Sequence, residues 1–230
     1  MIRSLFVNKT ALEKGAVRQQ GIVDQSVKIV GVLGAGMMGA GIALVSAMAG
    51  IKVILIDQQQ QAADRGKAHS ANYMDKGIKR GKATAEKKAA VLELITATTD
   101  YAALKDADLI IEAVFEDPTI KAGVTKAVEE VIPADCIFAS NTSTLPISDL
   151  AKASGRPDQF IGIHFFSPVE RMALVEIIKS KQTGDRAVAK ALDYVRQIRK
   201  TPIVVNDARF FYANRCIIPY INEGIRMVSE

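Results

Sequence analysis

The sequence is poor in the residues that build metal centres and disulfide frameworks. It has two cysteines, Cys136 and Cys216, and two histidines, His69 and His164, in 230 residues. Two cysteines make no framework, and Cys136 stands in an apolar, strand-like stretch that is typical of a buried thiol. We therefore expect no metal site. A reducing compartment is favoured, the bacterial-type cytoplasm more than the mitochondrial matrix.

Long apolar runs and nucleic-acid signatures are also missing. Every apolar stretch of about 18 residues is better explained as a strand, a helix and a strand in succession, so we expect no membrane span. The net charge of +5 can accompany nucleic-acid binding. No basic motif is interleaved with aromatic residues, however, and we expect no nucleic-acid partner.

The N-terminal residues 1–25 have weak periodicity, and Gly15 and Gly21 interrupt them. We expect a short helix and a linker, an extension that precedes the main domain. Residues 1–18 are basic and mildly amphipathic, as transit peptides are, but they include Glu13 and lack enrichment in serine and arginine. A linker or appended segment is the interpretation that we prefer.

Residues 27–57 hold the most informative pattern. An apolar run leads into Gly34-x-Gly36-x-x-Gly39, and an apolar helix-like stretch and a second apolar strand follow. The strand ends in Asp57. This order is typical of a dinucleotide-binding β–α–β unit. Gly34 permits the tight turn, Gly36 lets the backbone approach a pyrophosphate, and Gly39 lets the helix pack on the strand.

Asp57 predicts which dinucleotide binds. It follows Gly39 by 18 residues, near the spacing of about 20 at which an acid holds the ribose hydroxyls. Its carboxylate would repel a 2′-phosphate and Gln58 offers no cation, so the pattern favours NAD over NADP. A glycine-rich turn that packs tightly without a ligand is the alternative, but it does not explain Asp57.

Alternating strands and helices predict the fold class. We expect an α/β fold of the Rossmann type, a doubly wound and mostly parallel sheet over residues 26–208. Residues 60–95 have no strand-like run and predict one or two long helices. Residues 209–230 are predicted to form the first helix of a helical second domain. Because the apolar face of this helix has no partner in the sequence, we expect that the chain is cut inside that domain. The expected strands are 27–33, 52–56, 108–114, 136–140, 160–164, 174–178 and 202–205.

Four ordered motifs resemble one enzyme family. They are S-N-T-S-T-L-P-I at 140–147, H-F-F-S-P-V-E-R-M-A-L-V-E-I-I at 164–178, K-T-P-I-V-V-N-D at 200–207 and N-R at 214–215. With the glycine motif they resemble the L-3-hydroxyacyl-CoA dehydrogenases over residues 27–230. The resemblance is closest to the dehydrogenase portion of the multifunctional α subunit of fatty-acid β-oxidation. The segment M-I-R-S-L-F at 1–6 resembles the stretch that follows the hydratase part of those chains.

The resemblance implies a set of cofactor contacts. Glu116 and Lys121 match the family's cofactor-contacting acid and lysine, although by themselves they would be an ordinary pair at a helix start. Met38 lies in the glycine loop and is expected to pack on the cofactor. The residues implied for NAD binding are Gly34, Gly36, Met38, Gly39, Asp57, Val114, Glu116, Lys121, Ser143 and Ser167.

His164 is the candidate base. Oxidation of a secondary alcohol needs a group that takes the hydroxyl proton, and histidine titrates near neutral pH. Glu176, on the next strand-like run, is a candidate for the orienting partner, and the resemblance implies this pair. A satisfied buried histidine is the alternative for His164. His69 is interpreted as a residue on a helix surface.

Two further residues are implied to hold the substrate oxygen. Ser143 matches the family serine with this role, and the alternative is an N-cap of a short helix near Pro146. Asn214 matches the family asparagine near the nicotinamide, and the alternative is an amide on a helix surface.

Two positions depart from the family pattern. Ser167 stands where asparagine is common after His-Phe-Phe. Phe210 stands where a glycine usually precedes the segment that ends in Asn214-Arg215. Because a phenylalanine does not adopt a positive φ at low cost, we expect a different hinge into the helical domain.

The resemblance implies NAD-dependent oxidation of (3S)-3-hydroxyacyl-CoA to 3-oxoacyl-CoA. It also implies a homo-oligomer formed through the helical domain and a thiolase subunit as partner in a larger complex. The basic residues within 76–82 and 87–88 are interpreted as a solvated helix face or as a contact for the phosphates of a CoA-like ligand. The alternatives are a stand-alone 3-hydroxybutyryl-CoA dehydrogenase, which residues 1–25 disfavour, and a catalytically silent NAD-binding module.

Overall fold

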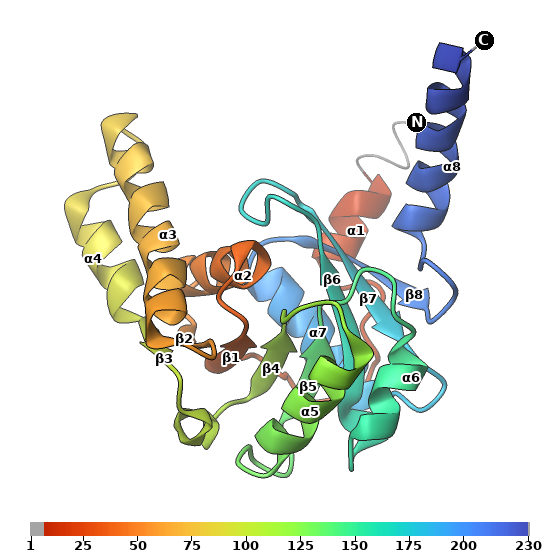
Figure 1. Cartoon of the computed structure of the whole chain (residues 1–230), viewed down its shortest axis with the longest axis horizontal. Coiled ribbons are helices and arrows are strands. Elements are labelled where there is room, and N and C mark those ends of the chain that lie inside the picture. The colour runs from red at the N-terminus through yellow and green to blue at the C-terminus, as the bar shows by residue number, and fades with distance from the viewer. Residues whose placement is uncertain (1–6, 230) are drawn as a thin grey trace.

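A central β-sheet organises the chain (Figure 1). The structure, a computed structural model, describes residues 7–229, so the M-I-R-S-L-F segment lies outside the described residues. Eight strands follow the order β3-β2-β1-β4-β5-β6-β7-β8. The strands are β1 (Ile29–Leu33), β2 (Lys52–Ile56), β3 (Ile95–Thr98), β4 (Leu109–Glu112), β5 (Ile137–Ser140), β6 (Phe160–Phe165), β7 (Leu174–Lys179) and β8 (Thr201–Asn206).

Helices connect the strands and cover both faces of the sheet. Short 3-10 helices are η2 (Tyr101–Leu104), η3 (Ala151–Ala153) and η4 (Pro157–Gln159). The α-helices are α1 (Lys9–Glu13), α2 (Met37–Met48), α3 (Gln60–Lys79), α4 (Ala85–Glu93), α5 (Pro118–Glu129), α6 (Ile147–Leu150), α7 (Asp185–Gln197) and α8 (Ala213–Ser229).

The strand directions confirm the predicted fold class. Strands β1 to β6 run parallel, and the chain changes direction across the sheet at β1, which pairs with β2 on one side and β4 on the other. Ligands of such sheets bind beyond the carboxyl ends of the strands at this switch point. β7 runs antiparallel to β6, with His164 opposite Glu176, and β8 runs parallel to β7.

Apolar side chains cover both faces of the sheet, which is why its strands appear in the sequence as near-continuous apolar runs. On one face, α2 and α7 pack on strand residues such as Val32 and Ile111. On the other face, α5 and α6 pack on the alternate residues, such as Leu33 and Ile110. The polar residues of the central strands are left at the strand ends, where a ligand can meet them.

Two helical arms extend from the sheet in Figure 1. The α3–α4 hairpin lies on one side, and α8 lies on the other and points away from the body of the molecule. Many apolar side chains of α8 are exposed, from 37% of the surface of Ile218 to 88% of that of Val228. The helix expected over residues 209–230 is therefore present as α8, and its apolar face is uncovered in this chain.

The N-terminal segment is held against the domain. The Arg18 guanidinium donates to the Asp193 carboxylate of α7 at 2.7 and 2.8 Å and to the carbonyl of Ile22 at 2.8 Å. The side chain of Gln197 bonds both backbone polar groups of Val27. The expected short helix is α1, but the residues expected to form a linker are fixed on α7.

The structure differs from the prediction at Ile95–Thr98. These residues form the edge strand β3, which begins at the last residue of the region expected to be helical. Only Ile95 is buried in this strand, so no apolar run or regular alternation signals it. Its pairing with β2 decides its conformation.

Candidate cofactor and active site

The glycine motif forms the turn between β1 and α2. Gly34 has φ +91°, a left-handed conformation that glycine adopts without strain. A Cβ on Gly34 would lie 2.6 Å from the carbonyl oxygen of Ala113. A Cβ on Gly39 would lie 1.7 Å from the carbonyl oxygen of Gly34. The tight turn and the close helix–strand contact expected of these two glycines are therefore present.

Gly36 faces open space instead. Among the described residues, no atom lies within 4 Å of the position that its Cβ would take. Gly36 precedes α2, whose first N–H groups have no acceptor within the helix. This space belongs to a cleft of about 540 Å³ at the ends of β1, β2 and β4. An uncovered backbone beside free N–H groups suits a pyrophosphate, so the residues present fit NAD.

Asp57 forms another wall of this cleft. Its carboxylate accepts hydrogen bonds from the backbone N–H groups of Ala35 and Gln58, both at 2.8 Å. Tyr101 lines the same cleft, and burial and the negative charge of Asp57 raise the pKa of its phenol. No lysine or arginine stands among the described residues that line the cleft. Nothing in this lining would therefore attract the 2′-phosphate of NADP.

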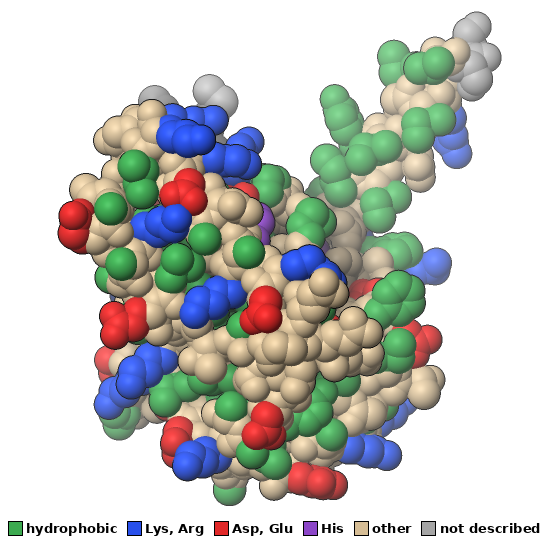
Figure 2. All heavy atoms as spheres, turned by 60° about the vertical axis from the view of Figure 1, so that its left-hand side comes forward, with side chains coloured by type: hydrophobic (Ala, Val, Ile, Leu, Met, Phe, Trp, Pro, Cys, Tyr) green, Lys and Arg blue, Asp and Glu red, His purple; other side chains and the backbone are tan. Residues whose placement is uncertain are grey.

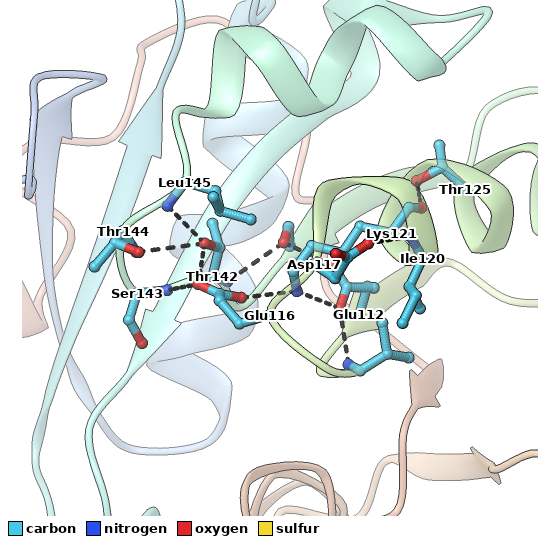
Figure 3. Close-up of polar contacts among 12 residues, drawn as sticks. Glu112, Glu116, Asp117, Ile120, Lys121, Thr125, Thr142, Ser143, Thr144 and Leu145 are labelled. Atoms are coloured by element: carbon cyan, nitrogen blue, oxygen red, sulfur yellow. Dashed lines mark hydrogen bonds and ion pairs between the residues drawn. The ribbon is translucent and has the colours of Figure 1, made fainter.

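A cluster of charged side chains lies beyond the end of β4 (Figure 3). The Lys121 ammonium lies 2.7 Å from a carboxylate oxygen of Glu112 and 3.1 Å from one of Glu116. The hydroxyl of Ser140 and the backbone N–H of Val114 also donate to Glu112, at 2.7 and 2.8 Å. Glu112 and Lys121 are almost completely buried, whereas the side chain of Glu116 is 38% exposed.

Glu116 connects this cluster to the loop after β5. It accepts the hydroxyl of Thr142 at 2.5 Å and the backbone N–H of Ser143 at 2.9 Å. Burial alone would raise the pKa of Glu116, but the Thr142 hydrogen bond and the charge of Lys121 hold it below its usual value. The Asn214 amide donates to the carbonyl of Ser143 at 2.9 Å. Glu116, Ser143 and Asn214, which come from distant parts of the chain, therefore lie together.

A second cavity, of about 400 Å³, opens at this cluster. Three of its residues also line the first cleft, so the two spaces are neighbours along the strand ends. The residues that line the second cavity are Met38, Ala113, Val114, Glu116, Lys121, Asn141, Ser143 and Thr144.

His164 and Glu176 form a buried pair between β6 and β7. The imidazole Nδ1 lies 2.8 Å from a carboxylate oxygen of Glu176, and the two side chains are 5% and 0% exposed. A carboxylate only accepts, so in the neutral ring Nδ1 carries the proton and Nε2 keeps its lone pair. The rings of Phe166 and Phe211 lie against the imidazole, with centroids 4.6 and 6.0 Å away.

The second carboxylate oxygen of Glu176 binds the start of α8. It accepts the backbone N–H groups of Tyr212 at 3.1 Å and Ala213 at 2.8 Å. Burial alone would raise the pKa of Glu176, but the hydrogen bonds from His164, Ala213 and Tyr212 together hold it below its usual value. One carboxylate therefore orients the imidazole and caps the helix that carries Asn214.

The expectation for Phe210 is wrong. Phe210 has φ +64° and Phe211 has φ +56°, so two successive phenylalanines adopt the left-handed conformation that Phe210 was expected to exclude. Phe211 is 2% exposed and packs in the core, and the Arg209 guanidinium lies 5.2 Å from the centroid of the Phe210 ring. Burial of Phe211 and the capping of α8 hold a backbone that local preference disfavours.

The alternative role considered for Ser143 is also wrong. The helix near Pro146 is α6, which has no cap from a side chain at its N-cap position. The carboxylate of Asp207 instead accepts the N–H groups of Ile147 at 2.9 Å and Ser148 at 2.7 Å. Ser143 is exposed at the edge of the second cavity, which leaves its hydroxyl available for a ligand.

The sequence analysis misses Glu112 as a member of this site. It stands in the run 108–114, whose apolar residues predict a buried strand and no site residue. A carboxylate in a run of buried residues is itself a signal, because burying a charge is costly unless it is paired.

Known proteins resemble the chain in sequence and structure. Residues 29–208 match the family described as "3-hydroxyacyl-CoA dehydrogenase, NAD binding domain". FadB2 of M. tuberculosis is 34% identical, with a TM-score of 0.86, over 89% of this chain and 72% of its own. The (S)-3-hydroxybutyryl-CoA dehydrogenase PaaH1 of Ralstonia eutropha is 40% identical, with a TM-score of 0.82, over 86% of this chain and 70% of its own.

The chain belongs to the 3-hydroxyacyl-CoA dehydrogenase family. It carries the NAD-binding domain of these oxidoreductases. It also resembles the dehydrogenase part of multifunctional enzyme 1 from C. elegans, which is 27% identical, with a TM-score of 0.74, over 88% of this chain and 49% of that protein. The predicted family, fold and cofactor are confirmed.

The remaining predicted positions of this dehydrogenase domain lie at its surface. Ser167 is exposed beside the glycine turn, with its hydroxyl 3.7 Å from the sulfur of Met37. Lys76, Lys79, Arg80 and Lys82 are exposed at the tip of the α3–α4 hairpin, where Figure 2 shows a group of basic side chains. Lys88 instead pairs with Asp75 at 2.7 Å.

Within residues 7–229, no helix is long and apolar enough to cross a membrane.

Proposed function

We propose that this chain oxidises (3S)-3-hydroxyacyl-CoA to 3-oxoacyl-CoA, with His164 as the base that takes the hydroxyl proton. The observation that supports this most strongly is the buried His164–Glu176 pair, which joins strands β6 and β7 of an NAD-binding sheet. Bound NAD supplies the acceptor for the C3 hydride. The residues implied to hold it line the two adjoining cavities or the glycine turn.

His164 is suited to accept a proton at Nε2. Glu176 fixes the ring through Nδ1 and stabilises the imidazolium that forms when Nε2 is protonated. The hydrogen bonds from α8 keep Glu176 ionised and in place. A general base of this kind contributes a factor of about 10²–10⁴ to the rate.

We assign the positioning of the reacting oxygen to Ser143 and Asn214. The Ser143 backbone is held on both sides, by Glu116 at its N–H and by Asn214 at its carbonyl. A hydroxyl on a backbone fixed in this way loses little entropy when it binds a ligand. We also assign a contact with the cofactor to Ser167, which lies beside Met37 at the glycine turn.

We assign the CoA phosphates to the tip of the α3–α4 hairpin. Four cations are exposed there, and the phosphate groups would pair with them. The solvated helix face remains the alternative, and it predicts no change in the Michaelis constant for the acyl-CoA when these cations are removed.

The exposed face of α8 supports a homo-oligomer or a covering helical domain. Its apolar residues include Ile217, Ile221 and Ile225, all 48% exposed or more. A contiguous apolar patch of more than a few hundred Å² usually finds a partner. We place the protein in the bacterial cytoplasm, where the exposed thiol of Cys216 would stay reduced. A thiolase subunit, which the resemblance to the multifunctional α subunits implies, is the partner that we propose for a larger complex.

The similarity to PaaH1 favours a second candidate, a dehydrogenase of short 3-hydroxybutyryl-CoA. A silent NAD-binding module is disfavoured, because the His164–Glu176 pair of the proposed catalytic design is intact.

Formation of NADH from (3S)-3-hydroxyacyl-CoA of several chain lengths tests the proposal. The assay uses the natural protein that contains this chain, with the (3R) substrates as control. We expect turnover of the (3S) substrates only, and little in the 230-residue chain alone because α8 is uncovered. Full turnover of both enantiomers would contradict the proposal, and so would the absence of turnover of either enantiomer by the natural protein.

A further inference from the structure

We propose that Lys200 is a positioning residue of the site, because it fixes the loop that holds Phe166 against the His164 imidazole. Lys200 begins the third of the four sequence motifs, and it is only 7% exposed. Its ammonium donates to the backbone carbonyls of Val169 and Met172, both at 2.6 Å. The inference rests on the proposed role of His164 as the base.

The Lys200 ammonium is compensated by one loop only. Lysine is seldom buried, because an ammonium that leaves water must find other partners. Among the described residues, Lys200 has no ion-pair partner, and its ammonium binds only the two carbonyl oxygens. Burial lowers the pKa of Lys200, and the negative charge of Glu170 opposes this effect. Displacement of the loop or of the ammonium would therefore leave buried polar groups unpaired.

This loop, residues 166–173, joins β6 to β7 and packs on α2 (Figure 1). Val169 is buried, and a Cβ on Gly41 of α2 would lie 2.8 Å from the Cβ of Val169. The N–H of Met172 donates to the carbonyl of Pro168 at 3.1 Å, which makes the middle of the loop a turn. Both carbonyls that accept from the ammonium belong to this turn, so the position of the turn on α2 depends on them.

The loop also contacts the base. Its first residue, Phe166, follows His164 by two positions, and the two ring centroids lie 4.6 Å apart. The hydroxyl of the next residue, Ser167, lies 3.7 Å from the sulfur of Met37 at the glycine turn. A loop that moved on α2 would change both contacts, so Lys200 acts on the base through Phe166.

Lys200 is itself held by regular structure. Its backbone N–H donates to the carbonyl of Val195 in α7 at 3.0 Å. Arg199, just before it, has φ +59°, and the N–H of Thr201, just after it, donates to the carbonyl of Ala173 at 2.8 Å. The ammonium therefore connects the loop to the end of α7 and the start of β8.

The first test records the imidazole C–H signals of the 230-residue chain by NMR. The chain has two histidines, so His69→Gln assigns the signals of His164. An aromatic ring in contact with the imidazole shifts these signals, and Phe166→Leu measures that shift. We expect Lys200→Met, which keeps the apolar stem and removes the donors, to move the His164 signals in the same direction.

Lys190→Met is the matched control for this test. Lys190 lies in α7 and is 6% exposed, and it has no hydrogen bond to the loop among the described residues. This variant should leave the His164 signals unchanged.

The second test measures turnover in the natural protein that contains this chain. We expect Lys200→Met to lower turnover by about 10–100-fold, the effect of a small misplacement at a reacting group. Lys200 lines a cavity of about 320 Å³. Propylammonium can therefore reach the space that Lys200→Ala leaves, and it should restore part of the turnover, whereas neutral 1-propanol should not.

The outcomes separate this inference from the proposed function. Unchanged His164 signals in folded Lys200→Met would overturn the inference, and so would a lower melting temperature with unchanged turnover, which indicates a purely structural lysine. If Lys200→Met does not fold, Lys200→Gln replaces it in both tests, and unchanged signals in that variant overturn the inference. Shifted His164 signals without turnover in the unmodified natural protein would contradict the proposed function alone.

Discussion

The three glycines of the β1–α2 turn perform different tasks. Gly34 needs its left-handed φ, Gly39 leaves no room for a Cβ, and Gly36 faces the cleft. The motif in the sequence predicts these separate roles, and the structure confirms the tight turn at Gly34 and the close packing at Gly39.

Gly36→Ala and Gly39→Ala should therefore fail in different ways. Gly36 has φ −66°, which alanine adopts, and its Cβ would meet nothing, so we expect nearly unchanged stability and at least about tenfold weaker NAD binding. Gly39→Ala would place a methyl group against the Gly34 carbonyl, and we expect a loss of several kcal/mol of folding stability. Urea unfolding and NAD titration of both variants check this. Equal stability of the two variants would contradict it.

Asp57 should control the choice between NAD and NADP. We expect the Asp57 carboxylate to meet the 2′ position of the adenosine ribose, and the cleft lining holds no lysine or arginine among the described residues. We expect tight NAD binding and far weaker NADP binding, and Asp57→Ala should reduce the difference between the two affinities. Calorimetry with both nucleotides measures it. Equal affinity of the unmodified chain for both would show that Asp57 does not select.

At the scale of elements, the sequence predicts seven of the eight strands of the described chain and misses the edge strand β3. Parallel strands buried on both faces leave apolar runs, such as Ile29–Leu33 and Lys52–Ile56. The edge strand β3 has one buried residue and leaves no such run. The left-handed backbone at Phe210 also escapes prediction, because burial of Phe211 and the cap on α8 outweigh local preference.

We expect substitution by glycine to have opposite effects on stability at the two adjacent phenylalanines before α8. Phe210→Gly relieves a left-handed conformation at a half-exposed side chain, and we expect stability to be kept or raised by about 1 kcal/mol. Phe211→Gly relieves the same strain but empties a buried site, and we expect a loss of about 2–4 kcal/mol. Denaturant midpoints measure both. A larger loss for Phe210→Gly than for Phe211→Gly would refute this explanation.

At the scale of the whole molecule, the site is assembled from distant segments. Asp57, Glu116 and Ser143 lie beyond the ends of β2, β4 and β5, His164 lies near the end of β6, and Asn214 lies at the start of α8. The parallel strands have their carboxyl ends on one side of the sheet, where ligands bind. The sequence indicates part of this arrangement, because Asp57, Glu116 and His164 each stand at or just after the end of an apolar run. It does not predict Glu112 or the Glu176 cap, because both depend on contacts across the fold.

The N-terminal segment should contribute to the stability of the domain. Arg18→Ala removes a bidentate contact with Asp193, whose side chain is 7% exposed, and we expect a loss of about 1–3 kcal/mol. Arg186→Ala, which removes an exposed pair with Asp135, is the matched control and should cost little. Thermal unfolding compares them. Equal melting temperatures in both variants and the unmodified chain would mean that the segment is only loosely attached.

The central claim is that His164, oriented by Glu176, takes the substrate proton. The most direct measurement is the turnover of His164→Ala beside its affinity for NAD, in the natural protein that contains this chain. We predict that turnover falls by about 10²–10⁴ while NAD affinity is nearly unchanged, because His164 is absent from the lining of both cavities. A variant that keeps most of its turnover would contradict the claim.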